Sequence, residues 1–252
     1  GLVIAGGARL RGADIATVQK LAGHASVTGF AFVDKNPNLE YKAVVTGDTN
    51  GRIPAYRVEV TAGEGDAGPR TQLDVTRQGG RVIWMIQPRF PGEQAISIDE
   101  ARQKAIRFLK DRDFGEMRST YYMQQQNTVT FNFAAVQDGV TLYPDLVKVT
   151  VALDNGEVIG AETTGYLMSH RQRQLPENII SQEQARATIN PRLEVTGGGL
   201  TLIPVGASDE KLTYEFRGKL GEETYLIYIN ADNGREENVL KLIETENGTL
   251  TM

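Results

Sequence analysis

Apolar and polar residues alternate along several short stretches of the chain, and each stretch runs into a turn rich in asparagine and glycine. The segment VKVTV (147–151) alternates in this way ahead of DNG at 154–156. A period of two is typical of a strand with one buried face. Asparagine followed by glycine accepts positive φ angles at little cost. The pattern therefore predicts a β-hairpin closed by a two-residue type I′ turn at 155–156.

This hairpin pattern recurs along the chain at intervals of almost 80 residues. A second DNG stands at 232–234, which is 78 residues after the first, and Gly80 precedes Gly156 by 76 residues. Strand-like stretches, NTVTFNF before the first DNG and LTYEF and YLIYIN before the second, complete the pattern. The chain is therefore expected to repeat one small structural unit three times.

A helix is predicted ahead of each group of strands. In ISIDEARQKAIRFLK, Ser97 and Glu100 have the spacing of a capping box, and apolar residues then follow a helical stripe. IISQEQARATINP repeats this arrangement with Ser181 and Gln184. The first unit is less regular, and its helix is expected to end at Gly23, because glycine commonly follows the last helical residue.

These units predict an α+β fold of three tandem domains, each with one helix packed on a small antiparallel sheet. Polar stretches that contain proline separate the units, PRFPGEQ before the second helix and RQRQLPEN before the third. The predicted domains are residues 1–90, a divergent first repeat, then 91–174 and 175–252.

The units resemble the PepSY domain, which combines a helix with a hairpin that carries DNG at its turn. Two longer segments, YPDLVKVTVALDNGEVIGAETTGYLMSHRQRQLP (143–176) and YINADNGREENVLKLIETENGTLTM (228–252), are similar to the C-terminal region of the YpeB family of bacterial spore-germination proteins. This resemblance is close over residues 96–252 and loose over the first 90 residues.

The resemblance implies a role in germination rather than in catalysis. Proteins of this family accompany a spore cortex-lytic enzyme, each needs the other for stable incorporation, and they restrain the enzyme until germination. They carry an N-terminal membrane anchor followed by PepSY repeats. We therefore expect this chain to act in the spore, on the outer side of the inner membrane facing the cortex. Its membrane attachment is expected only through an anchor upstream of Gly1.

Composition and charge narrow the remaining classes of function. A formal net charge of −5 leaves no basic surplus for phosphates, so nucleic acid is not expected as a partner. Cysteine is absent, which excludes disulfides and thiolate nucleophiles. The two histidines, His24 and His170, lack the spacing of a metal pair, and the neighbour Ser169 is poorly placed as a nucleophile for His170. We expect no catalytic residue, metal or cofactor.

An alternative is a module that binds or cleaves cell-wall glycan. A glycosidase needs two carboxylates roughly 5–10 Å apart. The adjacent acidic pairs at 209–210, 222–223 and 236–237 do not supply them, because neighbouring residues on a strand point to opposite faces. A pair assembled from distant segments stays open at this point, as does a spacer role for some of the repeats.

The candidate partner surface lies on the second repeat and its exit. Three consecutive apolar residues at 166–168 cannot all face the core of a strand, and concentrated positive charge follows them. Aromatic, methionine and arginine side chains are enriched in protein interfaces. The alternative is that 166–168 packs against the neighbouring repeat while the arginines solvate the linker. The candidate residues are Tyr143, Pro144, Asp145, Tyr166, Leu167, Met168, His170, Arg171 and Arg173.

Overall fold

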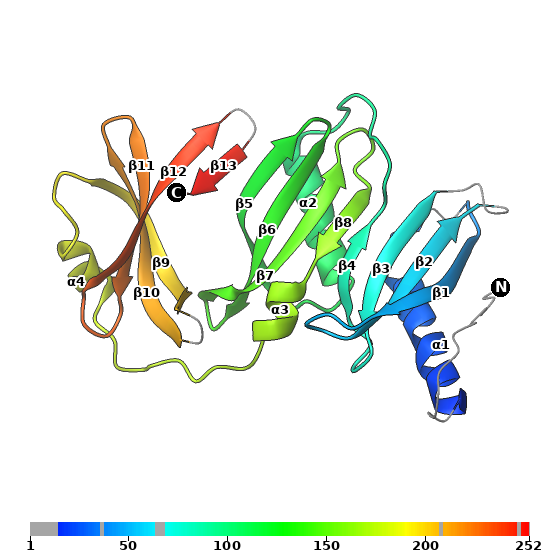
Figure 1. The fold of residues 1–252 in the computed structure, drawn as a ribbon. Helices are drawn as coiled ribbons and strands as arrows, with labels where there is room; N and C mark the ends of the chain where they lie inside the picture. Colours follow the sequence, from blue (N-terminus) through cyan, green and yellow to red (C-terminus); the bar gives the residue numbers. More distant parts are fainter. Residues whose placement is uncertain (1–14, 36–37, 64–68, 207–208, 246–247, 252) are drawn as a thin grey trace.

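A computed structural model describes residues 15–35, 38–63, 69–206, 209–245 and 248–251. The fold is α+β, with a large mixed sheet and few helices (Figure 1). The helices are α1 (Ile15–Phe32), α2 (Ile98–Lys110), α3 (Thr164–Ser169) and α4 (Gln182–Ala187). The strands are β1 (Tyr41–Thr49), β2 (Ala55–Ala62), β3 (Arg70–Thr76), β4 (Val82–Ile86), β5 (Met117–Gln125), β6 (Thr128–Gln137), β7 (Val140–Ala152), β8 (Val158–Glu162), β9 (Glu194–Val205), β10 (Asp209–Leu220), β11 (Glu223–Asn230), β12 (Glu236–Thr245) and β13 (Gly248–Thr251).

The strands of the three units join into one sheet, where the sequence predicts a separate small sheet in each unit. Its order is β1-β2-β3-β4-β8-β7-β6-β5-β13-β12-β11-β10-β9. β4 pairs antiparallel with β8, so the first two hairpins form a continuous surface. The third group of strands meets the second twice, through the parallel pairing of β7 with β9 and through Gly248 of β13 opposite Met123 of β5.

The three repeated hairpins close in the same way, but not with the predicted type I′ turn. In each, the last residue of one strand donates its N–H to the carbonyl five residues later: Thr76 to Arg81, Ala152 to Glu157 and Asn230 to Arg235, at 2.7–2.9 Å. Within the DNG loops only the glycine has a positive φ. The asparagine instead accepts a backbone hydrogen bond with its side chain, at 2.9 Å in both loops, and this local bond outcompetes the tighter turn.

The loop glycine of each hairpin lies against the helical side of its unit. A side-chain carbon at Gly156 would come within 3.0 Å of the Ile96 side chain, and one at Gly234 within 3.4 Å of Ile180. A side-chain carbon at Gly80 would lie 3.2 Å from the His24 ring of α1. All three glycines have positive φ angles, of 55–76°. The positive φ angles favour glycine at all three positions, and at Gly80 and Gly156 the space for a side chain is also restricted.

Both predicted capping boxes are confirmed. Ser97 and Glu100 exchange hydrogen bonds at the start of α2, and Ser181 and Gln184 do so at the start of α4. The residue before each cap donates its N–H to the hairpin loop of the same unit, at 2.9–3.0 Å. The cap thus fixes both the start of the helix and its position over the sheet.

The predicted end of the first helix at Gly23 is wrong. α1 continues to Phe32 because apolar residues resume beyond the glycine, and Ala25 and Phe32 are buried. The Phe32 ring packs edge-on against Phe108 of α2, with 5.4 Å between centroids. A second glycine, Gly29, then allows the helix to approach β2 closely.

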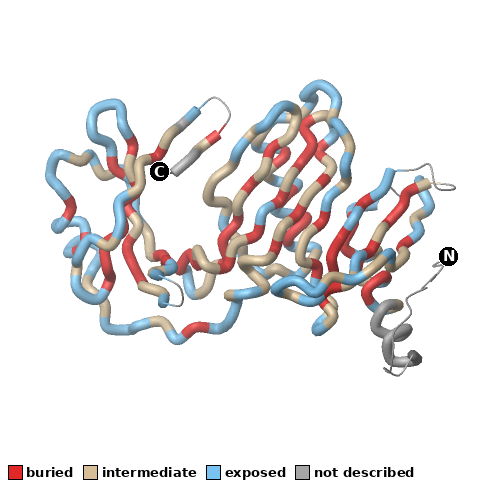
Figure 2. The backbone as a smooth tube through the Cα atoms, viewed as in Figure 1, coloured by how far each residue is buried: buried red, intermediate tan, exposed pale blue. Residues whose placement is uncertain are grey.

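Buried side chains cluster across the junctions between the units. Figure 2 shows where the buried residues lie along the backbone. One buried cluster combines α1 and β1–β4 with α2 and β6–β8. A second combines α4 and β9–β11 with residues at the turn between β6 and β7, including Leu142. The described structure therefore buries side chains across both places where the units meet.

The stretch PRFPGEQ between the first two units is held firmly on the second hairpin loop. Arg89 forms two hydrogen bonds with Asp154, at 2.8 and 2.9 Å, and an ion pair with Glu157 at 3.1 Å. The N–H of Gly92 also donates to Asp154, at 2.8 Å. These contacts, chiefly the hydrogen bond from Arg89, lower the pKa of Asp154 from its ordinary value of 3.8 to about 2.

Gly29→Ala is expected to destabilise the protein, although alanine is normally better than glycine within a helix by about 1 kcal/mol. The new methyl group would lie 2.8 Å from Cγ1 of the fully buried Val58. Overpacking of this kind costs about 1–3 kcal/mol. This loss of stability is measured by chemical denaturation of three variants: Gly29→Ala, Val58→Ala and the double variant. The double variant should be more stable than the two single effects added together. Simple additivity would contradict the close contact.

The ion pair of Asp154 predicts a pH dependence of stability. A carboxylate with a lowered pKa stabilises the fold fully above its ordinary value of 3.8, and this contribution disappears as the pH falls towards about 2. Between about pH 4 and 2, Asp154→Asn should therefore lose less stability than the wild type. Asp232→Asn is the matched control, because Asp232 has the same place in the third loop and is exposed. Equal acid sensitivity of the wild type and Asp154→Asn would contradict the prediction.

Candidate partner-binding surface

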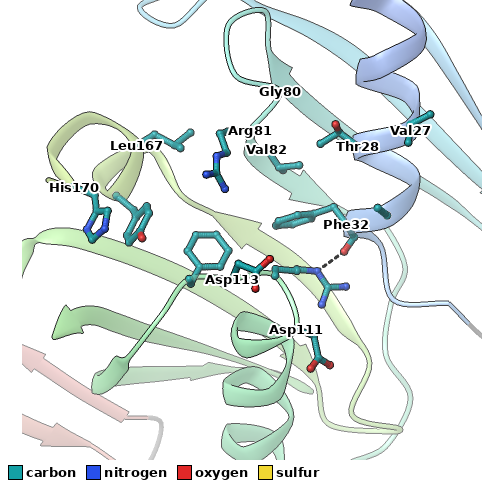
Figure 3. A pocket seen from close by; sticks show the side chains of 14 residues that line it. Val27, Thr28, Phe32, Gly80, Arg81, Val82, Asp111, Asp113, Leu167 and His170 are labelled. Atoms are coloured by element: carbon teal, nitrogen blue, oxygen red, sulfur yellow. Dashed lines mark hydrogen bonds between the residues drawn. The ribbon is translucent and has the colours of Figure 1, made fainter. Parts of the chain in front are cut away.

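An open groove of about 610 Å³ lies where the first two units meet (Figure 3). Its walls come from α1, the loop between β3 and β4, the residues after α2, and α3. Apolar side chains line much of it, among them Phe32, Phe114 and Tyr166. Charged side chains, including Arg81 and Asp113, stand among them (Figure 3). A mainly apolar hollow with a few charged groups is typical of a binding site.

Residues 166–168 form part of α3, so the extended conformation assumed in the sequence analysis is wrong. The short helix lets Tyr166 pack against both large buried clusters. The Tyr166 ring contacts Phe114 edge-on, with 5.2 Å between centroids, and stacks on the ring of His170 at 4.1 Å. Burial raises the pKa of Tyr166. Leu167 faces the groove, whereas Met168 is 46% exposed.

Arg112 lines the groove at the point where the C-terminal ends of α1 and α2 meet. Its guanidinium donates to the carbonyl of Phe32 at the end of α1 and to that of Phe108 near the end of α2, at 2.6 and 3.0 Å. It also pairs with Asp34 at 2.8 Å. A cation at two helix C-termini meets the partial negative charge of both. Burial nevertheless lowers the pKa of Arg112.

Residues 143–145 form a bulge in β7. Ala134 pairs with Leu146 and Ala135 with Leu142, so the three residues between have no partner on β6. Pro144 has no N–H for the ladder, which accounts for the interruption at this point. The Tyr143 hydroxyl donates to Glu215 at 2.7 Å.

The bulge also places Asp145 in a buried cluster of charges. Arg173 forms two hydrogen bonds with Asp145, at 3.0 and 2.7 Å, and two with Glu210 of β10, at 2.8 and 2.7 Å. The exposed fractions of the Asp145, Arg173 and Glu210 side chains are 0%, 5% and 16%. Arg173 lowers the pKa of Glu210, and the two carboxylates raise that of Arg173. This cluster ties the second unit to the third.

The structure brings most of the predicted residues together, in two adjoining groups. Tyr166, Leu167 and His170 line the groove. Asp145, Arg171 and Arg173 join the charge cluster, in which Arg171 pairs with Glu210 at 2.9 Å and His170 Nδ1 lies 2.7 Å from Asp145. The groove also contains residues that were not predicted: Arg81, Arg112, Phe114 and several residues of α1. These come from distant segments, and no local pattern marks them.

The contact between Asp145 and His170 resembles part of a nucleophile-activating arrangement. Asp145 is, however, also bound by Arg173, and no hydroxyl of the described residues forms a hydrogen bond with the other ring nitrogen of His170. The described residues contain no group of three or more histidine, aspartate and glutamate side chains arranged to hold a metal ion. None of the described helices is long and apolar enough to cross a membrane.

Arg173→Ala is expected to lower the free energy of unfolding by about 3–5 kcal/mol, because it leaves Asp145 buried without its cation. Arg171→Ala is the matched control. Its side chain is 57% exposed and pairs with the same Glu210, so its loss should cost below about 1 kcal/mol. Urea denaturation measures both variants. Similar small losses would contradict a structural role for Arg173.

Two family models match the chain. One, described as YpeB sporulation, PepSY1 and PepSY2 domains, covers residues 17–176. The other, described as peptidase propeptide and YPEB domain, covers residues 179–240.

Curated relatives and a solved structure agree with these matches. Sporulation protein YpeB of Halalkalibacterium halodurans is 41% identical over 203 residues, which are 81% of this chain and 45% of the relative. Its namesake from Bacillus subtilis is 34% identical, over 69% of this chain and 39% of the relative. The chain thus spans less than half the length of these relatives. The Bacillus megaterium YpeB C-terminal domain superposes with a TM-score of 0.75 at 33% identity, over 87% of this chain and 96% of that domain.

Proposed function

The chain belongs to the YpeB family of sporulation proteins, and on that premise we propose that it binds, stabilises and restrains a spore cortex-lytic enzyme without cutting the cortex itself. The family description that matches its third unit names peptidase propeptides, which are segments that accompany an enzyme. A protein that restrains an enzyme must cover part of the enzyme's surface. The place proposed for it is the outer side of the inner spore membrane, facing the cortex.

We further propose that the chain consists of three tandem PepSY-like units with the limits 1–90, 91–174 and 175–252. The repeated loop closure, the repeated glycine contacts and the two capping boxes support this organisation. Because buried clusters extend across the junctions, the units offer the partner one firm surface.

The observation that carries the proposed binding role is the groove beside α3. Arg81 is exposed at its edge and forms no ion pair with another described residue, so its charge is available to a partner. Leu167 and Met168 add accessible apolar surface on α3. Among the candidate residues, we assign partner contact to Leu167, Met168, His170 and Arg171, and support of this surface to Tyr143, Pro144, Asp145, Tyr166 and Arg173.

Mixing the purified chain with the cortex-lytic enzyme tests this role. The wild-type chain should bind the enzyme and slow its release of cortex fragments. A double variant, Arg81→Glu with Leu167→Asp, should raise Kd at least about tenfold and lose the inhibition, since it removes both charge and apolar contact at the groove. Arg192→Glu is the matched control, because it reverses an exposed charge in the third unit. Circular dichroism establishes that each variant is folded.

The chain alone should release no reducing sugar or soluble fragment from cortex peptidoglycan. Release that increases with time and disappears when one carboxylate is replaced would favour the glycan-cleaving alternative. Equal affinity of the wild type and the folded double variant would remove the groove from the binding site.

A further inference from the structure

Phe90 is the most exposed large hydrophobic side chain of the described residues, with 98% of its surface accessible. The segment that carries Phe90 is fixed by hydrogen bonds on both sides of the residue. Arg89 beside it forms hydrogen bonds with Asp154, and Gly92 two residues later donates to the same carboxylate. Asn127 also donates to the carbonyl of Pro91, at 3.5 Å. The backbone on both sides is therefore held while the ring projects into solvent.

The architecture does not require an aromatic residue at this position. Arg89 lies eight residues before the cap Ser97, and Arg173 lies eight residues before the cap Ser181, so the two arginines are equivalent. Both bind carboxylates, Arg89 at Asp154 in the hairpin loop, and Arg173 at Asp145 of β7 and Glu210 of β10. The residue that follows Arg173 is the polar and exposed Gln174. Phe90 is thus a feature of the stretch before α2 that the stretch before α4 does not repeat.

A projecting aromatic ring on a held loop has the properties of a binding anchor. Aromatic side chains that fill a pocket contribute most to protein interfaces. Pro88 and Pro91 flank the ring and restrict the backbone further. Little conformational freedom then remains to be lost on binding, which favours affinity.

We propose that Phe90 inserts into an apolar pocket with a basic rim on the cortex-lytic enzyme, as an anchor distinct from the groove. This inference rests on the proposed function. The basic rim follows from Glu93, which is exposed on the same loop and forms no ion pair with another described residue. A carboxylate three residues from the anchor is complementary to lysine or arginine at the edge of the pocket.

A folded protein fits this feature better than a lipid surface or a second copy of the chain. An anionic membrane attracts clusters of basic residues, whereas Glu93 next to this single ring is acidic. A second copy would bring another Glu93 to the contact, and like charges oppose such pairing.

Phe90→Gln tests the anchor, because it places the residue of the equivalent position 174 on an unchanged loop. Leu220→Gln is the matched control, since Leu220 is a 45% exposed apolar residue of the third unit. Biolayer interferometry measures binding of the wild type and each variant to purified cortex-lytic enzyme. Phe90→Gln should raise Kd at least about tenfold with an unchanged melting temperature, and Leu220→Gln should leave Kd within about twofold.

The outcomes separate this inference from the proposed function. Binding of the wild type with an unchanged Kd for Phe90→Gln would overturn the anchor and leave the proposed function standing. No binding by the wild type would overturn both. Flotation with vesicles of phosphatidylglycerol and cardiolipin that depends on Phe90 would assign the ring to a lipid surface. Self-association in sedimentation that depends on Phe90 would assign it to a second copy. Either result would overturn the inference.

Discussion

The close contact between a hairpin loop and its helical side sets the geometry of every unit. Gly156 lies too near the isoleucine that precedes α2 for a larger residue to fit without displacement, and Gly234 lies in contact distance of the isoleucine that precedes α4. The same isoleucines donate their N–H groups to these loops. In the second and third units, loop, cap and helix therefore form one hydrogen-bonded assembly over the sheet. The recurrence of DNG is explained by this contact rather than by the turn type that the sequence first indicates.

Three arginines connect elements of neighbouring units or of one unit. Arg112 brings the ends of α1 and α2 together, Arg89 binds the entry of the second unit to its hairpin loop, and Arg173 binds β7 to β10. Each guanidinium has several donors in a planar arrangement, so one side chain satisfies several acceptors at once. Because these contacts accompany shared apolar clusters, the surface of each unit has a defined position relative to the next.

The sequence predicts what depends on near neighbours and misses what depends on distant ones. Ser97 and Ser181 lie three residues from their partners, and both caps are confirmed. The helix at Tyr166 is packed instead against the distant Phe114, and the bulge at Pro144 depends on the register of β6. The groove itself draws on four separate segments. The three consecutive apolar residues at 166–168 indicate the right region, although they lie on a short helix and not on the expected strand.

The two proposed contact points lie at opposite ends of one helix. Phe90 precedes the start of α2, whereas Asp111 to Phe114, which border the groove, follow its end. Thirteen helical residues span about 20 Å. A standard interface buries about 800 Å² on each partner, which is roughly 30 Å across, so one protein can reach both points. The outer side of α2 between them carries Ile106, a partly exposed apolar residue. A partner that lies along this helix would contact two units at once, and its binding would then depend on the junction that Arg112 maintains.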